Sequence, residues 1–226
     1  GMLMMMLIMK VVIIVLLIDM KIQDQMIGAR EPLETLASIT VSRRFADDRF
    51  MAMLARLFLV IAGSALVGLA AQIEVPWYPV PVTGQTLMVL LIGMAYGPAL
   101  GATTIIVYLL EGAIGLPMFA GGAAGWPVLF GITGGYLIGF VPATFLVGVL
   151  ALRGMGRTML GAITAMILGN LVIYAFGVAW LQGFIGFDKA VTGGLLPFIY
   201  GDLLKIVIAA VAMPAAWRTV QKFQGK

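Results

Sequence analysis

The stretch Leu195-Leu-Pro-Phe-Ile-Tyr-Gly-Asp-Leu-Leu-Lys205 opens a segment that is apolar enough to cross a bilayer, yet it carries an acid and a base. Charged side chains are costly at membrane depth and usually mark a functional site there. Asp202 and Lys205 are three residues apart, so a helix presents them on one face. We interpret the pair as the polar floor of a small-molecule pocket. The alternative is a buried ion pair that only fixes helix packing.

The composition of the whole chain agrees with a membrane location. Of its 226 residues, 62% are hydrophobic and 11% are charged, whereas about a quarter of the residues in a soluble domain are charged. The apolar runs are long and do not alternate, which predicts an all-α integral membrane protein and argues against a β-barrel. The net charge of +4 is spread along the chain, so we expect it to set membrane orientation and not to bind nucleic acid.

Two residue types that commonly carry enzyme chemistry are missing from the sequence. It has no cysteine and no histidine, which removes thiolate nucleophiles, imidazole bases and the usual zinc ligands. It also has no paired-carboxylate motif and no glycine-rich loop of the nucleotide-binding kind. We therefore expect no catalytic residues, no metal site and no cofactor. A membrane enzyme that uses Asp202 or Glu111 as an acid or base is the disfavoured alternative.

The sequence divides into three parts. Residues 1–49 form an N-terminal hydrophobic segment and a polar linker, residues 50–217 a membrane domain, and residues 218–226 a basic cytoplasmic tail. Three interpretations of residues 2–18 stay open: an extra spanning helix, a segment lying on the membrane surface, or an extension with no role in the domain. We expect the linker, residues 19–49, to be cytoplasmic and partly helical.

Six membrane helices are predicted, with irregular connections at 73–82, 114–133 and 185–192. The expected helices are 50–72, 83–96, 99–113, 134–152, 159–184 and 193–217. Basic residues cluster before the first helix, between the fourth and fifth, and after the sixth, so that side is predicted to be cytoplasmic. The three connections then lie outside. Asp202 would lie about 13 Å below the start of the last helix, at 1.5 Å per residue.

The two longer connections are candidates to cap a pocket. Residues 74–82 contain three prolines, which favour extended backbone, next to Trp77 and Tyr78. Residues 114–136 are rich in glycine, which lets backbone approach a ligand closely. The alternative is an interfacial turn for the first connection and a re-entrant turn, whose polar groups are satisfied internally, for the second.

The polar and aromatic residues of these segments suit a small, largely apolar ligand that bears amide-like groups. We expect the side chains of Trp77 and Phe198 to contribute to the apolar wall of the pocket. The candidate ligand-binding residues are Asp202, Lys205, Gln85, Tyr136, Asn170, Phe119, Trp126, Thr83 and Tyr108. In the first helix, Ser64 and Gly68 form a small-residue pair that allows close helix approach. Two interpretations stay open for this pair, docking of a partner membrane subunit and packing within the chain.

Four motifs, in order along residues 50–217, resemble one known family. They are Val80-Pro-Val-Thr-Gly-Gln-Thr-Leu87, Gly112-Ala-Ile-Gly-Leu-Pro-Met-Phe-Ala-Gly-Gly122, Thr133-Gly-Gly-Tyr-Leu-Ile-Gly-Phe140 and Gly201-Asp-Leu-Leu-Lys205. Together they resemble the BioY family, the biotin-specific substrate-binding (S) component of energy-coupling factor (ECF) transporters. The resemblance implies a six-helix S-component bundle in the cytoplasmic membrane that captures biotin from outside with high affinity. It also implies that the acid and lysine of the last helix belong to the pocket.

The resemblance further implies partners: a transmembrane coupling subunit and two cytoplasmic ATPase subunits. This chain has no Walker motif, so ATP hydrolysis would come from those subunits. The sequence departs from many relatives at Ile132, where they have proline, and offers no basic anchor between 119 and 133. The ligand carboxylate is then left to backbone N–H groups or to Lys205. The alternative functions are an S component for another small vitamin-like ligand, or a membrane scaffold with a structural ion pair.

Overall fold

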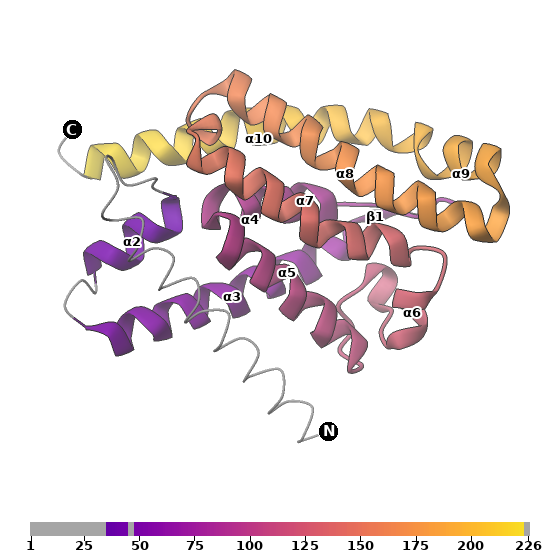
Figure 1. The fold of residues 1–226 in the computed structure, drawn as a ribbon, viewed down its shortest axis with the longest axis horizontal. Coiled ribbons are helices and arrows are strands. Elements are labelled where there is room, and N and C mark those ends of the chain that lie inside the picture. The colour runs from indigo at the N-terminus through magenta and orange to yellow at the C-terminus, as the bar shows by residue number, and fades with distance from the viewer. Residues whose placement is uncertain (1–34, 45–47, 224–226) are drawn as a thin grey trace.

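The computed structural model describes residues 35–44 and 48–223 and shows an elongated bundle of helices (Figure 1). The predicted hydrophobic segment 2–18, and with it the question of an extra helix, lies outside the described residues. The elements are α2 (Leu36–Arg44), α3 (Arg49–Ala71), β1 (Glu74–Val75), β2 (Val82–Thr83), α4 (Gln85–Tyr96), α5 (Pro98–Ala113), η1 (Ala120–Gly122), α6 (Trp126–Phe130), α7 (Gly134–Leu152), η2 (Met155–Arg157), α8 (Met159–Ile185), α9 (Phe187–Gly194) and α10 (Leu196–Phe223).

The six predicted membrane helices are present as α3, α4, α5, α7, α8 and α10, and the all-α membrane fold is confirmed. Among the described residues, four helical stretches are long and apolar enough to span a bilayer: Arg49–Ala71, Gly134–Leu152, Met159–Ile185 and Phe187–Lys222. The helices α4 and α5 are shorter, with 12 and 16 residues. They correspond to about 18 and 24 Å of helix, less than the hydrocarbon thickness of about 30 Å.

Local sequence signals explain where several helices begin. The Asp48 carboxylate accepts hydrogen bonds from the N–H groups of Phe50 and Met51 and so caps α3. Thr158 caps α8 in the same way through the N–H of Gly161. Between α4 and α5 the chain turns at Gly97, whose φ of 85° favours glycine because glycine has no Cβ atom. Pro98 then starts the next helix.

The prediction of an irregular connection at 185–192 is wrong, because this segment contains the helix α9. Gly186 ends α8 with a φ of 82°, and a new helix starts at Phe187. Asp188 lies in the first turn of α9, where the helix dipole favours a negative charge. The segment looked irregular in sequence because its polar residues and glycines interrupt the apolar run, but an amphipathic helix at the end of the bundle tolerates them.

The connections predicted to lie together gather at one end of the bundle, which we call the loop end (Figure 1). It consists of the β1–β2 hairpin, η1, α6 and α9, while α2 and η2 lie at the opposite end. The hairpin pairs Glu74 with Thr83 and Val75 with Val82. The end of α3, just before the hairpin, is tied to the glycine-rich segment, because Gln72 Nε2 donates a hydrogen bond of 3.1 Å to the carbonyl of Phe119.

The small-residue face of α3 points into the bundle, so of the two interpretations of Ser64 and Gly68 the structure supports packing within the chain and not docking of a partner subunit. Ser64 is 1% exposed and Gly68 is buried. A Cβ atom at Gly68 would lie 2.9 Å from the Cε atom of Met118. These residues pack α3 against other parts of the same chain, and the exposed face of α3 carries large apolar side chains such as Phe58 and Leu69.

We therefore expect Gly68→Leu to destabilise the protein by itself. The added side chain would have to displace Met118, and overpacking of this kind costs about 1–3 kcal/mol. Thermal unfolding in detergent or nanodiscs measures the effect. The matched control is Ala65→Leu on the exposed face of the same helix, which should leave the melting temperature within about 1 °C since it disturbs no packing. Equal melting temperatures for the two variants would contradict this assignment of the α3 faces.

Candidate functional site

A cavity of about 180 Å³ lies between the hairpin, the glycine-rich segment and the helices α4, α7, α8 and α10. Apolar and aromatic side chains form most of its wall, and a few polar groups converge on it, as is usual for a small-molecule site. The residues that line it are Val80, Pro81, Thr83, Gln85, Thr86, Phe119, Ala120, Ala123, Val128, Thr133, Tyr136, Leu137, Phe140, Ile173, Tyr174, Phe198 and Lys205.

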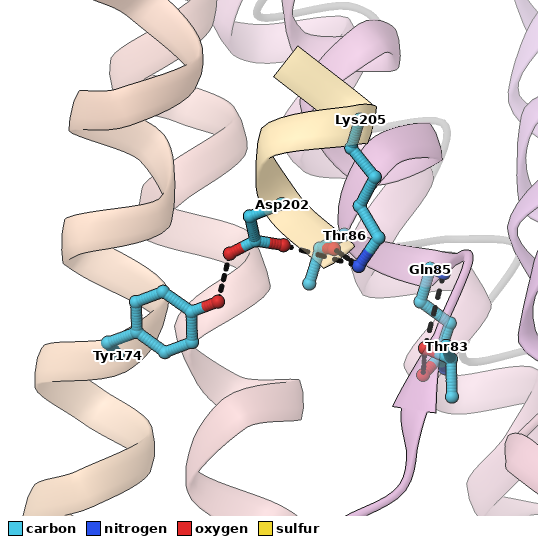
Figure 2. Close-up of polar contacts among 6 residues, drawn as sticks. All are labelled: Thr83, Gln85, Thr86, Tyr174, Asp202 and Lys205. Atoms are coloured by element: carbon cyan, nitrogen blue, oxygen red, sulfur yellow. Dashed lines mark hydrogen bonds and ion pairs between the residues drawn. The ribbon is translucent and has the colours of Figure 1, made fainter. Parts of the chain in front are cut away.

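The Asp202–Lys205 pair lies at one wall of the cavity within a four-residue network (Figure 2). Lys205 Nζ lies 3.2 Å from Asp202 Oδ1 and donates a hydrogen bond of 2.8 Å to Thr86 Oγ1. The Tyr174 hydroxyl donates to Asp202 Oδ2. Asp202 is 5% and Lys205 8% exposed, so both charges are buried and both have hydrogen-bond partners. A buried ion pair is tolerated when hydrogen bonds satisfy both charged groups, as they do here.

The two charged residues have different access to the cavity. Lys205 lines it, together with Thr86 and Tyr174, whereas Asp202 is held behind them. An ammonium group has three N–H donors, and two of those on Lys205 are engaged by Thr86 and Asp202. The remaining N–H can meet an acceptor on a ligand.

A second polar network joins the hairpin to α4, α5 and the glycine-rich segment. Thr83 Oγ1 donates to Gln85 Oε1 at 2.9 Å, and Gln85 Nε2 donates to the Tyr108 hydroxyl. Tyr108 in turn donates to the carbonyl of Met118 at 3.0 Å. Thr83 and Gln85 face the cavity, and Tyr108 is fully buried behind them. This network fixes the orientation of the cavity's one amide side chain.

Three aromatic rings form a continuous wall from the ion pair to the loop end. The rings of Tyr136 and Phe198 stack with centroids 6.1 Å apart, and Tyr174 meets Phe198 edge-on at the same distance. The Tyr136 hydroxyl donates to the carbonyl of Gly194 at 2.7 Å, where α9 ends. The wall therefore depends on residues of α7, α8, α9 and α10.

The structure brings together most of the candidate residues predicted from the sequence. Lys205, Gln85, Thr83, Tyr136 and Phe119 line the cavity, as does Phe198. Asp202 and Tyr108 form the layer behind, each bonded to a lining residue.

Three further predicted residues neither line this cavity nor belong to the layer behind it. Trp126 is 46% exposed and stacks on Phe130 with centroids 6.2 Å apart. Trp77 is 53% exposed on the hairpin. Asn170 is buried in α8 at 5% exposure without reaching the cavity. The aromatic content of a loop and the polarity of a helix residue do not by themselves fix the direction in which a side chain points.

Sequence reasoning missed Tyr174 and Thr86, the partners of the ion pair. Thr86 lies within the motif at residues 80–87, directly after Gln85. Tyr174 lies four residues after Asn170, on the same helix face. Both were detectable as polar residues within membrane helices, but their bonds to Asp202 and Lys205 depend on helix packing. In the described part of the chain, no cluster of acidic residues could hold a metal ion.

Comparison with known proteins decides the family. The BioY family model matches residues 40–222. The chain belongs to the BioY family. The match extends beyond the four motifs to nearly all of the described residues.

Two relatives illustrate the similarity. The chain is 42% identical over 153 residues to the probable biotin transporter BioY of Pyrococcus horikoshii, covering 68% of this chain and 90% of that protein. It is 38% identical to the biotin transporter BioY of Thermotoga maritima, covering 68% and 91%. The fold is similar to a crystal structure of the S component for biotin from an ECF-type transporter, with a TM-score of 0.65, 24% identity, and coverage of 73% and 92%. The likeness confirms the S-component fold.

Proposed function

We propose that this chain captures biotin from outside the cell and, as the substrate-binding component of an ECF-type transporter, delivers it for uptake across the cytoplasmic membrane. The observation that carries the proposal is the Tyr174–Asp202–Lys205–Thr86 network at the wall of an apolar cavity. Membership of the BioY family and relatives named biotin transporters support the identity of the ligand.

Charge balance favours one orientation of the ligand. Asp202 and Lys205 together carry no net charge, so a carboxylate placed against them would leave one negative charge buried, which is costly. The ureido group of biotin is neutral. Its carbonyl can accept the third N–H of Lys205, and its two N–H groups can donate to the hydroxyl oxygens of Thr86 and Tyr174. We therefore assign the ureido ring to this network.

The ligand carboxylate then lies toward the loop end. The cavity there is lined by Ala120 and Ala123, on either side of Gly121 and Gly122. Both glycines have positive φ, 64° and 72°. The N–H groups of Gly122 and Ala123 are already bonded within the segment, to the carbonyls of Phe119 and Ala120. We infer that the carboxylate is met by other backbone N–H groups of this segment, in place of the missing basic side chain.

The remaining parts of the proposal concern partners and orientation in the membrane. We infer that a transmembrane coupling subunit and two cytoplasmic ATPase subunits complete the transporter, because this chain has no Walker motif. Arg153, Arg157, Arg218 and Lys222 support a cytoplasmic location for the end opposite the loops. The cavity then opens outward. Biotin is the only small-molecule ligand in this proposal, and no cofactor is required.

Titration of the purified full-length chain in nanodiscs with biotin tests the proposal. We expect a dissociation constant well below about 1 μM, that is, a binding free energy beyond about −8 kcal/mol. Biotin amide, which has no carboxylate, should bind more weakly than biotin but still measurably. Desthiobiotin, which keeps the ureido group, serves as a positive control for that group. Biotin affinity weaker than micromolar would contradict the proposal and favour another vitamin-like ligand.

A further inference from the structure

Asn170 is a buried amide for which the cavity provides no role. It lies in the middle of α8 and is 5% exposed. Neither its Nδ2 nor its Oδ1 atom has a hydrogen-bond partner among the described residues. Buried amides in native proteins are nearly always satisfied, and an unsatisfied one requires a specific explanation.

The position of Asn170 relates it to the ion pair. It lies four residues before Tyr174, so the two side chains share a face of α8. Tyr174 contacts Asp202 on α10, and α8 and α10 run in opposite directions (Figure 1). Because the helices are antiparallel, the step from Tyr174 back to Asn170 on α8 runs in the same direction as the step from Asp202 on to Lys205 on α10. Asn170 is therefore expected at about the level of Lys205. Asn170 lies beneath the network, on the side away from the loop end.

The surroundings restrict what the amide can bind. Next to it in sequence, Gly169 packs closely against Leu90 and Val147, and Ala209 of α10 is fully buried. Packing this close next to the amide excludes any species larger than a water molecule or a small ion. A cation would satisfy only Oδ1 and an anion only Nδ2, whereas water both donates and accepts. Buried waters typically join about three polar groups that are otherwise unsatisfied.

We propose that Asn170 holds a buried water that joins its amide to the Asp202 carboxylate of this ion pair from below. Asn170 is then a positioning residue, which keeps the pair in place beneath the ligand without contacting it. The inference rests on the proposed biotin site for its functional consequence, but the hydration site itself does not depend on the ligand.

Asn170→Ala and Asn170→Ser form the matched test, because the two side chains differ mainly by one hydroxyl. Serine can retain the water, whereas alanine removes the polar group. We expect Asn170→Ala to weaken biotin binding about tenfold, and Asn170→Ser to stay within about threefold of the unmodified protein. Equal affinities for the two variants would overturn the proposal. Asn170→Leu with a raised melting temperature and unchanged biotin affinity would also overturn it, because the amide would then be only a packing defect.

A measurement without ligand separates this inference from the biotin proposal. The melting temperatures of the unmodified protein, Asn170→Ala, Thr86→Val and the double variant, all measured without biotin, form a double-mutant cycle. Since Thr86 accepts from Lys205, a shared network predicts that the two losses are not additive. If the losses of stability are additive, the proposed water between Asn170 and the ion pair is ruled out, even if biotin binds tightly. If the unmodified protein fails to bind biotin while the losses are coupled, the proposed function fails and the hydration site stands.

Discussion

Lys205→Met is expected to weaken biotin binding by more than 100-fold. The substitution removes the N–H donor that faces the cavity and the hydrogen bond to Thr86 at 2.8 Å. It keeps an unbranched apolar chain, so the shape of the site changes little. A loss of 100-fold corresponds to about 2.7 kcal/mol of binding free energy. Isothermal titration with biotin in nanodiscs measures it.

The same substitution also leaves the Asp202 carboxylate buried without its positive partner. Removing one member of a buried ion pair costs about 3–5 kcal/mol of folding free energy, so the melting temperature should fall. The double variant Asp202→Asn/Lys205→Met removes both charges and should recover much of that stability. We expect the double variant to remain unable to bind biotin.

These two measurements separate a binding role from a purely structural one. If the pair only fixed the packing of α10, the stable double variant would bind biotin as well as the unmodified protein does. That outcome would favour the scaffold interpretation of the sequence. Restored stability together with lost affinity would instead assign Lys205 to the ligand.

Tyr174→Phe is expected to weaken biotin binding by about tenfold or more. The ring stays edge-on to Phe198, but Asp202 Oδ2 loses the hydroxyl donor that holds it. Hydrogen bonds to charged groups contribute about 1.5–3 kcal/mol. With one oxygen unpaired, Asp202 can change its rotamer and draw Lys205 out of position. Titration with biotin and thermal unfolding without it would measure both effects.

Tyr136→Phe is the matched control, since it also removes one hydroxyl from an aromatic residue of the same wall. That hydroxyl donates to the backbone of Gly194 and not to the ion pair. We expect Tyr136→Phe to change biotin affinity by less than about threefold, because its ring still stacks on Phe198. Equal losses for the two variants would show that the hydroxyl of Tyr174 has no special role in positioning Asp202.

The membrane helices could be predicted because the bilayer imposes a strong and local constraint. Every backbone group in the hydrocarbon must be paired within the chain, so long apolar runs become helices whatever their neighbours are. The run 134–152 was predicted at the bounds observed for α7. The helix α9 was missed because it lies at the end of the bundle, where this constraint no longer holds.

The orientation of the helix faces was harder to predict. Ser64 and Gly68 indicate a close approach to another helix, but lipid, a partner subunit and a helix of the same chain all present similar apolar surfaces. Packing against Met118 decides among them. In the same way, Trp126 is aromatic and close in sequence to cavity residues, yet it stacks on Phe130 at the surface.

The sequence alone determined that this protein is an α-helical membrane protein and that Asp202 and Lys205 share one face of its last helix. Both conclusions follow from composition and from spacing within one helix. Only the tertiary structure decided that Lys205 lines the cavity while Asp202 is held behind it. That difference depends on Tyr174, 28 residues before Asp202, and on Thr86, 119 residues before Lys205. Contacts over such separations arise from helix packing, which no local pattern in the sequence specifies.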